Sequence, residues 1–106
     1  MRDFRKLKLW DKAHSLTLHI YRASKGFPRD ELFGLTSQMR RAAASVCANV
    51  AEGCGRRGGA EFARFLDIAM GSASELEYHI LLSADLQLVD RDTYVQLNSA
   101  VVQVSA

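Results

Sequence analysis

The sequence predicts an all-α protein: an antiparallel, up-down-up-down four-helix bundle that forms one domain over residues 1–106. Along most of the chain, apolar residues recur at steps of three and four, which is the spacing of one face of an α-helix. The breaks between these stretches are short and contain glycine or proline. Long helices joined by short turns fold back on their neighbours, so an antiparallel bundle is expected.

The first helix is predicted over about residues 7–24 and the second over about residues 29–53. Gly26 suits a helix C-terminus and Pro28 suits the first turn of the next helix. The apolar rhythm of the second helix continues into Asn49, which places this amide at a helix seam. The two apolar stripes are Leu9, Ala13, Leu16, Ile20 and Ala23, then Leu32, Leu35, Met39, Ala42 and Val46.

The third helix is predicted over about residues 60–89, after a turn at 53–59 in which four of seven residues are glycine. Gly71 lies inside this helix, where glycine costs about 1 kcal/mol relative to alanine, so a close neighbour such as a crossing helix is expected there. Asp90 suits the N-cap of a short fourth helix. The stripes are Phe62, Leu66, Ala69, Ala73, Leu76 and Ile80, then Tyr94, Leu97, Val101 and Val104.

The composition argues against a membrane-spanning protein and against a secreted one. No apolar run reaches the roughly 18 residues that a membrane span needs, and the residues after Met1 lack the apolar segment of a secretory signal. Cys47 and Cys54 lie seven residues apart on one predicted helix, too far to bond with each other. Reduced thiols and a cytoplasmic location without membrane contact are therefore expected.

The charge is divided unevenly. Residues 1–57 contain twelve Lys and Arg against five Asp and Glu, a net charge of +7, whereas residues 58–106 contain two against seven, a net charge of −5. Two interpretations remain open: the basic half faces nucleic acid, or it pairs with the acidic half of the same or another copy.

Apolar residues beside the main stripes exceed what one small bundle can bury, so self-association through a second face is expected. Those residues are Trp10, Tyr21, Cys47, Val50, Cys54, Ile68, Leu82 and Val102.

An ordered set of short motifs extends over residues 4 to about 90. They are Phe4, Leu7, Trp10 and Ala13; Tyr21 with Phe27-Pro28; Glu31-Leu32-Phe33-Gly34-Leu35; Gln38-Met39-Arg40-Arg41-Ala42-Ala43; Ser45-Val46; Asn49-Val50-Ala51-Glu52-Gly53; and Phe62, Phe65-Leu66, Ala69, Gly71-Ser72 and Glu75-Leu76. In these motifs the chain resembles a family of small bacterial four-helix-bundle proteins encoded within intervening sequences of 23S rRNA genes, also called the S23 ribosomal protein family.

The resemblance implies a four-helix bundle that assembles into a homo-oligomeric ring, typically a pentamer. The related accessory variability proteins of diversity-generating retroelements bind a reverse transcriptase and nucleic acid through basic surfaces. For the plain intervening-sequence members no firm activity is implied, because the ribosomal label reflects gene location. This chain differs in its short fourth helix and in its glycine-rich second turn.

Six basic residues are the candidates for binding RNA or DNA: Arg40, Arg41, Arg56, Arg57, Lys8 and Lys12. Arg40 and Arg41 point about 100° apart on a helix, so one is expected in an ion pair and the other is left for phosphate. Arg56 and Arg57 precede a helix N-terminus, which favours anions; two solvated arginines are the alternative. The lysines flank Trp10, which either packs or stacks on unpaired bases.

Four polar residues are expected to form a buried network that fixes helix register: Asn49, Glu52, Ser72 and Glu75. The alternative, a catalytic pair formed by Glu52 and Glu75, requires a cleft and raised pKa values. His14, His19 and His79 form no metal-ligand pattern with the cysteines. No catalytic residue, metal or cofactor is therefore predicted.

These features leave three classes of function for the protein. The first is a non-enzymatic homo-oligomer that associates with nucleic acid or a ribonucleoprotein partner through a basic surface. The second is a purely structural assembly or protein-docking module. An enzyme is the third, and no motif supports it.

Overall fold

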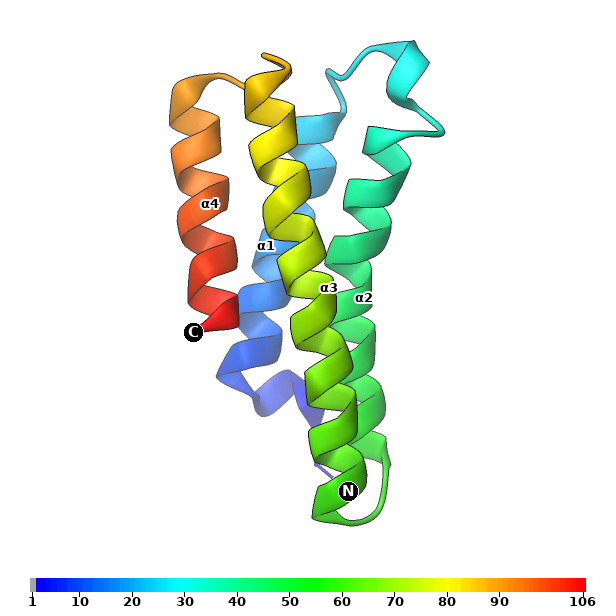
Figure 1. The fold of residues 1–106 in the computed structure, drawn as a ribbon. Coiled ribbons are helices and arrows are strands. Elements are labelled where there is room, and N and C mark those ends of the chain that lie inside the picture. The colour runs from blue at the N-terminus through cyan, green and yellow to red at the C-terminus, as the bar shows by residue number, and fades with distance from the viewer. Residues whose placement is uncertain (1) are drawn as a thin grey trace.

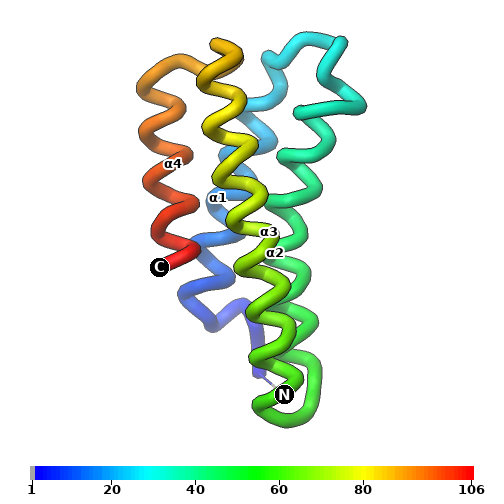
Figure 2. The backbone as a smooth tube through the Cα atoms, viewed as in Figure 1, coloured from blue at the N-terminus to red at the C-terminus, as the bar shows by residue number. Residues whose placement is uncertain are grey.

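The computed structural model describes residues 2–106 and shows four α-helices that run alternately up and down (Figure 1). Helix α1 packs against α2 and α4, and α3 packs against the same two helices, so the bundle is square in section. The α2–α3 hairpin extends beyond the start of α1 and the end of α4 (Figure 2). The elements are η1 (Phe4–Lys6), α1 (Lys8–Ser24), η2 (Arg29–Glu31), α2 (Leu35–Gly55), α3 (Gly59–Asp85) and α4 (Arg91–Ser105).

The predicted stripes supply most of the core. Ala42, Ala43, Ala69 and Ala73 are each at most 1% exposed. Such small side chains let α2 and α3 approach closely, while larger residues fill the space between the helix pairs. The larger core residues are Leu16, Ile20, Leu35, Met39, Val46, Val50, Leu76, Ile80, Leu97, Val101 and Val104.

The second helix begins later than predicted. Residues 29–31 form a 3₁₀ turn, residues 32–34 form a further turn, and α2 starts at Leu35. The reason is local: the Glu31 carboxylate accepts a hydrogen bond from the Leu35 backbone N–H at 3.2 Å, which caps the new helix. Leu32, predicted in the apolar stripe, is consequently 48% exposed, and Phe33 is 92% exposed.

The third helix ends at Asp85, four residues earlier than predicted. Leu88 donates its backbone N–H to the Ser83 carbonyl and Gln87 donates to the Ala84 carbonyl, the bonds of a Schellman motif. Gln87 takes the left-handed conformation that this motif needs, with φ at 61°. The prediction of Asp90 as the next N-cap is confirmed, because its carboxylate accepts from the Thr93 N–H at 2.7 Å.

Two glycines have opposite surroundings. A Cβ at Gly53 would lie 3.0 Å from the Cβ of Phe65, so the close contact between α2 and α3 here favours glycine. Gly71 faces open space with nothing within 4 Å of an added Cβ. The expectation of a crossing helix at Gly71 is therefore wrong for residues 2–106.

The second apolar face is smaller than predicted. Val50 and Cys54 are at most 1% exposed and belong to the interior. Trp10, Cys47 and Leu82 are half-buried. Exposed large apolar side chains remain, and those predicted for the second face are Tyr21, Ile68 and Val102. No helix within residues 2–106 has the length and hydropathy needed to cross a membrane.

Candidate nucleic-acid interface

The N-terminal segment lies against the α2–α3 hairpin. Arg2 donates its backbone N–H to the Cys54 carbonyl at 3.0 Å, and its guanidinium lies 4.0 Å from the centre of the Phe62 ring. This contact brings together two basic segments, residues 2–12 and 52–64, which we call the hairpin end. It contains eight Lys and Arg against four Asp and Glu.

The two arginines of the hairpin turn differ in their contacts. Arg56 pairs with Glu52 at 2.7 Å and lies over the Phe65 ring. Arg57 is exposed, and within residues 2–106 its guanidinium makes no ion pair or side-chain hydrogen bond. Helix α3 begins two residues further on at Gly59, and its N-cap, Gly58, takes a φ of 85° and supplies no side-chain cap. The first amides of α3 therefore point outward beside a free arginine, an arrangement that attracts anions.

Lys8 and Lys12 are exposed on α1. Trp10 stands about 160° around the helix from both, because successive residues are separated by about 100°. Its ring packs against the core, stacks on His14 at 4.7 Å and meets Phe4 edge-on at 5.0 Å. The lysines and the aromatic rings thus occupy opposite faces of α1.

Arg40 and Arg41 point apart, as their spacing predicts, and both have partners. Arg40 donates from Nε to the Ser24 hydroxyl at 2.8 Å and from Nη2 to the Tyr21 carbonyl at 3.3 Å. Arg41 pairs with Glu75 at 2.5 Å and remains 60% exposed. These two arginines lie about 22 Å along α2 from the hairpin turn. The six predicted basic residues therefore do not form one surface.

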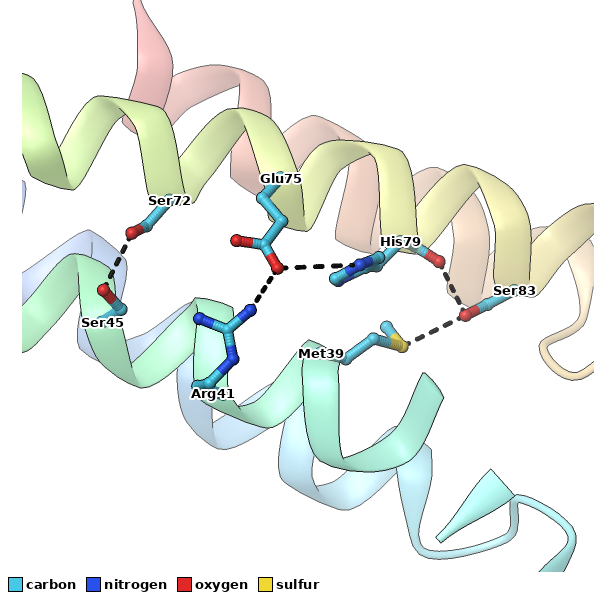
Figure 3. A network of polar contacts seen from close by, with 7 residues as sticks. All are labelled: Met39, Arg41, Ser45, Ser72, Glu75, His79 and Ser83. Carbon is cyan, nitrogen blue, oxygen red and sulfur yellow. Dashed lines mark hydrogen bonds and ion pairs between the residues drawn. The ribbon is translucent and has the colours of Figure 1, made fainter. Parts of the chain in front are cut away.

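A polar seam joins α2 to α3 (Figure 3). Asn49 donates to the Ser45 carbonyl at 2.8 Å and hydroxyl at 3.0 Å, and the Ser45 hydroxyl bonds that of Ser72 at 2.8 Å. Glu75, bound to Arg41, continues the seam. Glu52 is outside it, because its carboxylate turns along α2 to Arg56 instead. The predicted network thus lacks Glu52 and includes Ser45, which its position one turn before Asn49 could have indicated.

His79 extends the seam and was not predicted in it. Its side chain is buried, its Nε2 lies 3.8 Å from the Glu75 carboxylate, and its buried Nδ1 has no partner within residues 2–106. Burial lowers the pKa of His79 below its usual value, Glu75 opposes this shift, and Arg41 adds to it. The imidazole is therefore neutral at pH 7 and has a structural place in the seam.

The two cysteines are unpaired thiols. Burial raises the pKa of Cys47 and of Cys54, which disfavours the reactive thiolate. In the part of the chain that the structure describes, no three His, Cys, Asp or Glu side chains are grouped to hold a metal ion.

Comparisons with known proteins agree with this architecture. A family model described as "23S rRNA-intervening sequence protein" matches residues 5–106. The chain is also similar to a crystal structure of a protein with unknown function from the S23 ribosomal protein family of Bacteroides thetaiotaomicron. The TM-score is 0.81 and the identity 24%, over 92% of this chain and 91% of that one. No curated protein matches. Because the family model spans nearly the whole bundle, this chain belongs to the 23S rRNA-intervening sequence protein family.

Proposed function

We propose that this protein is a cytoplasmic, non-enzymatic homo-oligomer that binds RNA through its hairpin end. The observation that carries the proposal is a set of exposed cations without internal partners in the two segments of the hairpin end, one of which precedes the uncapped N-terminus of α3. Lys8, Lys12 and Arg57 are exposed, and within residues 2–106 none makes an ion pair or side-chain hydrogen bond. Their charge is left for an external anion, and a phosphate backbone supplies many.

Assembly strengthens this interaction. A ring of identical copies, for which the resemblance favours a pentamer, repeats the hairpin end once per copy. Summed charges give tight binding that depends steeply on salt and weakly on sequence. Arg41 and Arg56 remain half-exposed or more within their ion pairs, and they stay secondary candidates for phosphate contact.

We expect Lys8→Gln/Arg57→Gln to weaken RNA binding and to flatten its salt dependence. Removing two phosphate contacts lowers the slope of log K against log salt by about 1.4 for single strands. Filter retention of a single-stranded RNA across a salt series measures this slope.

The matched control is Arg22→Gln/Arg91→Gln, which removes the same charge from exposed positions outside the hairpin end. It should keep the wild-type slope. Equal slopes for the two double variants, or no retention of RNA by the wild type at low salt, would overturn the proposal.

The opposite end of the bundle favours a second candidate function, a docking module. Phe33 is 92% exposed beside Leu32, and burying a Phe side chain is worth about 1.5–3 kcal/mol. We expect Phe33→Ser to reduce the mass of the assembly in light scattering, whereas Val95→Ser, at a residue that is 49% exposed on α4, should leave it unchanged. An unaltered mass for Phe33→Ser would exclude this residue from the contact. A mass that falls with salt, without RNA retention, would favour docking over RNA binding.

A further inference from the structure

Two adjoining cavities lie where α1 ends and α2 begins. Their volumes are about 280 and 460 Å³, and their walls share Leu32, Thr36 and Arg40. The charged residues in these walls are all basic: Lys25, Arg29, Arg40 and Arg41. A cavity whose charged residues are all cations focuses positive potential and attracts an anion.

Only some of these basic side chains form ion pairs or hydrogen bonds with other residues of the chain. Lys25 and Arg29 are exposed, and within residues 2–106 neither makes an ion pair or a side-chain hydrogen bond. Arg40 uses Nε and Nη2 to hold the end of α1, which leaves Nη1 without a partner among the described residues. Arg41 is neutralised by Glu75. Three basic groups therefore remain for a ligand.

Thr36 is the second, independent sign of a ligand. Its side chain is 4% exposed, and its buried hydroxyl has no hydrogen-bond partner in the described part of the chain. Unpaired buried hydroxyls are uncommon and call for an explanation. Thr36 also lies in the first turn of α2, where the helix dipole favours negative charge. Glu31 caps only the Leu35 amide at this terminus.

We propose that these cavities, here called the loop-end site, bind a phosphate group. Lys25, Arg29 and Nη1 of Arg40 neutralise its charge, and the Thr36 hydroxyl donates to one of its oxygens. Contact with this buried hydroxyl requires a neighbouring side chain to move, and the candidate is Leu32, which lines both cavities beside Thr36 and is 48% exposed. The site goes beyond the proposed function, because it lies at the opposite end of the bundle from Arg57.

The first test is titration of the ¹⁵N-labelled full chain with inorganic phosphate at constant ionic strength, with chloride as the replaced ion. The amides of Thr36 and Ser37 should shift and saturate. The absence of a saturable shift up to about 50 mM phosphate, well above a Kd of about 1 mM, would overturn the proposal.

Lys25→Gln/Arg29→Gln should weaken phosphate binding about tenfold, as expected when charged hydrogen bonds are lost. Arg22→Gln/Arg91→Gln removes the same charge from residues outside these walls and should change the affinity less than about twofold. Similar losses in both variants would indicate a general charge effect and contradict a built site.

Thr36→Val separates a ligand contact from a merely unpaired group. The methyl group that replaces the buried hydroxyl should raise the stability of the phosphate-free protein. The same change should weaken phosphate binding about tenfold if the hydroxyl contacts the ligand. A stabilised variant with unchanged phosphate affinity would overturn this role of Thr36.

The phosphate has two possible sources, which a pair of RNA strands distinguishes. A 5′-phosphorylated single strand is compared with its 5′-hydroxyl twin, using Lys8→Gln/Arg57→Gln protein to remove the hairpin-end contribution. Tighter binding of the phosphorylated strand, lost in the further Lys25→Gln/Arg29→Gln change, identifies an RNA end. Equal binding, with inorganic phosphate still bound, identifies free phosphate. Failure at Arg57 and failure at the loop-end site therefore give different results.

Discussion

Replacing Leu76 with Ala is expected to lower the free energy of unfolding by about 3–5 kcal/mol. Leu76 is fully buried at the centre of α3, where it belongs to the core that all four helices share. The change removes apolar contacts and leaves a cavity that rigid helices cannot close. Domains of this size have a total stability of about 5–15 kcal/mol, so the loss is a large share of the whole. Urea unfolding followed by circular dichroism measures it.

Leu81→Ala is the matched control, because it makes the same chemical change on the same helix at a residue that is 45% exposed. Its cost should be below about 1 kcal/mol, as for surface substitutions generally. Equal losses at both positions would mean that the outer face of α3 is packed as tightly as the inner one.

The protein is expected to lose stability as the pH falls below about 6.5, and His79 is the reason. Its folded-state pKa is lowered by burial, so the unfolded chain takes up the proton first. The stability contribution of the neutral imidazole is complete above the unfolded pKa of about 6.5 and is lost as the pH falls through the folded pKa. Each unit of difference between the two pKa values corresponds to about 1.4 kcal/mol.

Urea unfolding at several pH values between about 5 and 7.5 checks this slope. His79→Leu should flatten it, because the variant has no buried proton acceptor at this position. The charged neighbours Glu75 and Arg41 stay in place in the variant and keep their ion pair. His14→Gln, an exposed control, should retain the wild-type slope. A slope unchanged by His79→Leu would assign the acid sensitivity to other groups.

The helices of this bundle can be predicted from the sequence, because apolar periodicity and capping residues are local features that recur along each helix. About four to seven turns of apolar periodicity in each helix outweigh any single exception. Asp90 indicates the start of α4, because its side chain is suited to an N-cap and forms that hydrogen bond. The start of α2 could not be predicted, because Leu32 fits the apolar spacing and extends the predicted helix beyond its true start at Leu35. The contact that sets the start of α2 is the hydrogen bond from the Leu35 backbone N–H to the Glu31 carboxylate. Such a local bond competes with continuation of the helix, and the spacing of apolar residues does not reveal it.

The candidate site was predictable in composition and less so in arrangement. The sequence identified Arg57 and the lysines as basic, and it placed Asn49 at the seam. It could not show that Glu52 would turn to Arg56, because a residue on a helix has ion-pair partners both along its own helix and on a facing one. The loop-end site was missed because its cations come from three separate segments that only tertiary folding brings together.

The order of the helices around the square has a consequence for how the chain reaches its fold. Three of the four helix contacts join consecutive helices, across residues 25–34, 56–58 and 86–90, and only the α1–α4 contact closes the two ends of the chain. Closing a short loop between two helices costs little chain entropy, and the packing of those helices offsets that cost. Such connectivity is typical of helical proteins that fold in microseconds to milliseconds, which shortens the time in which nascent copies expose their apolar faces to one another.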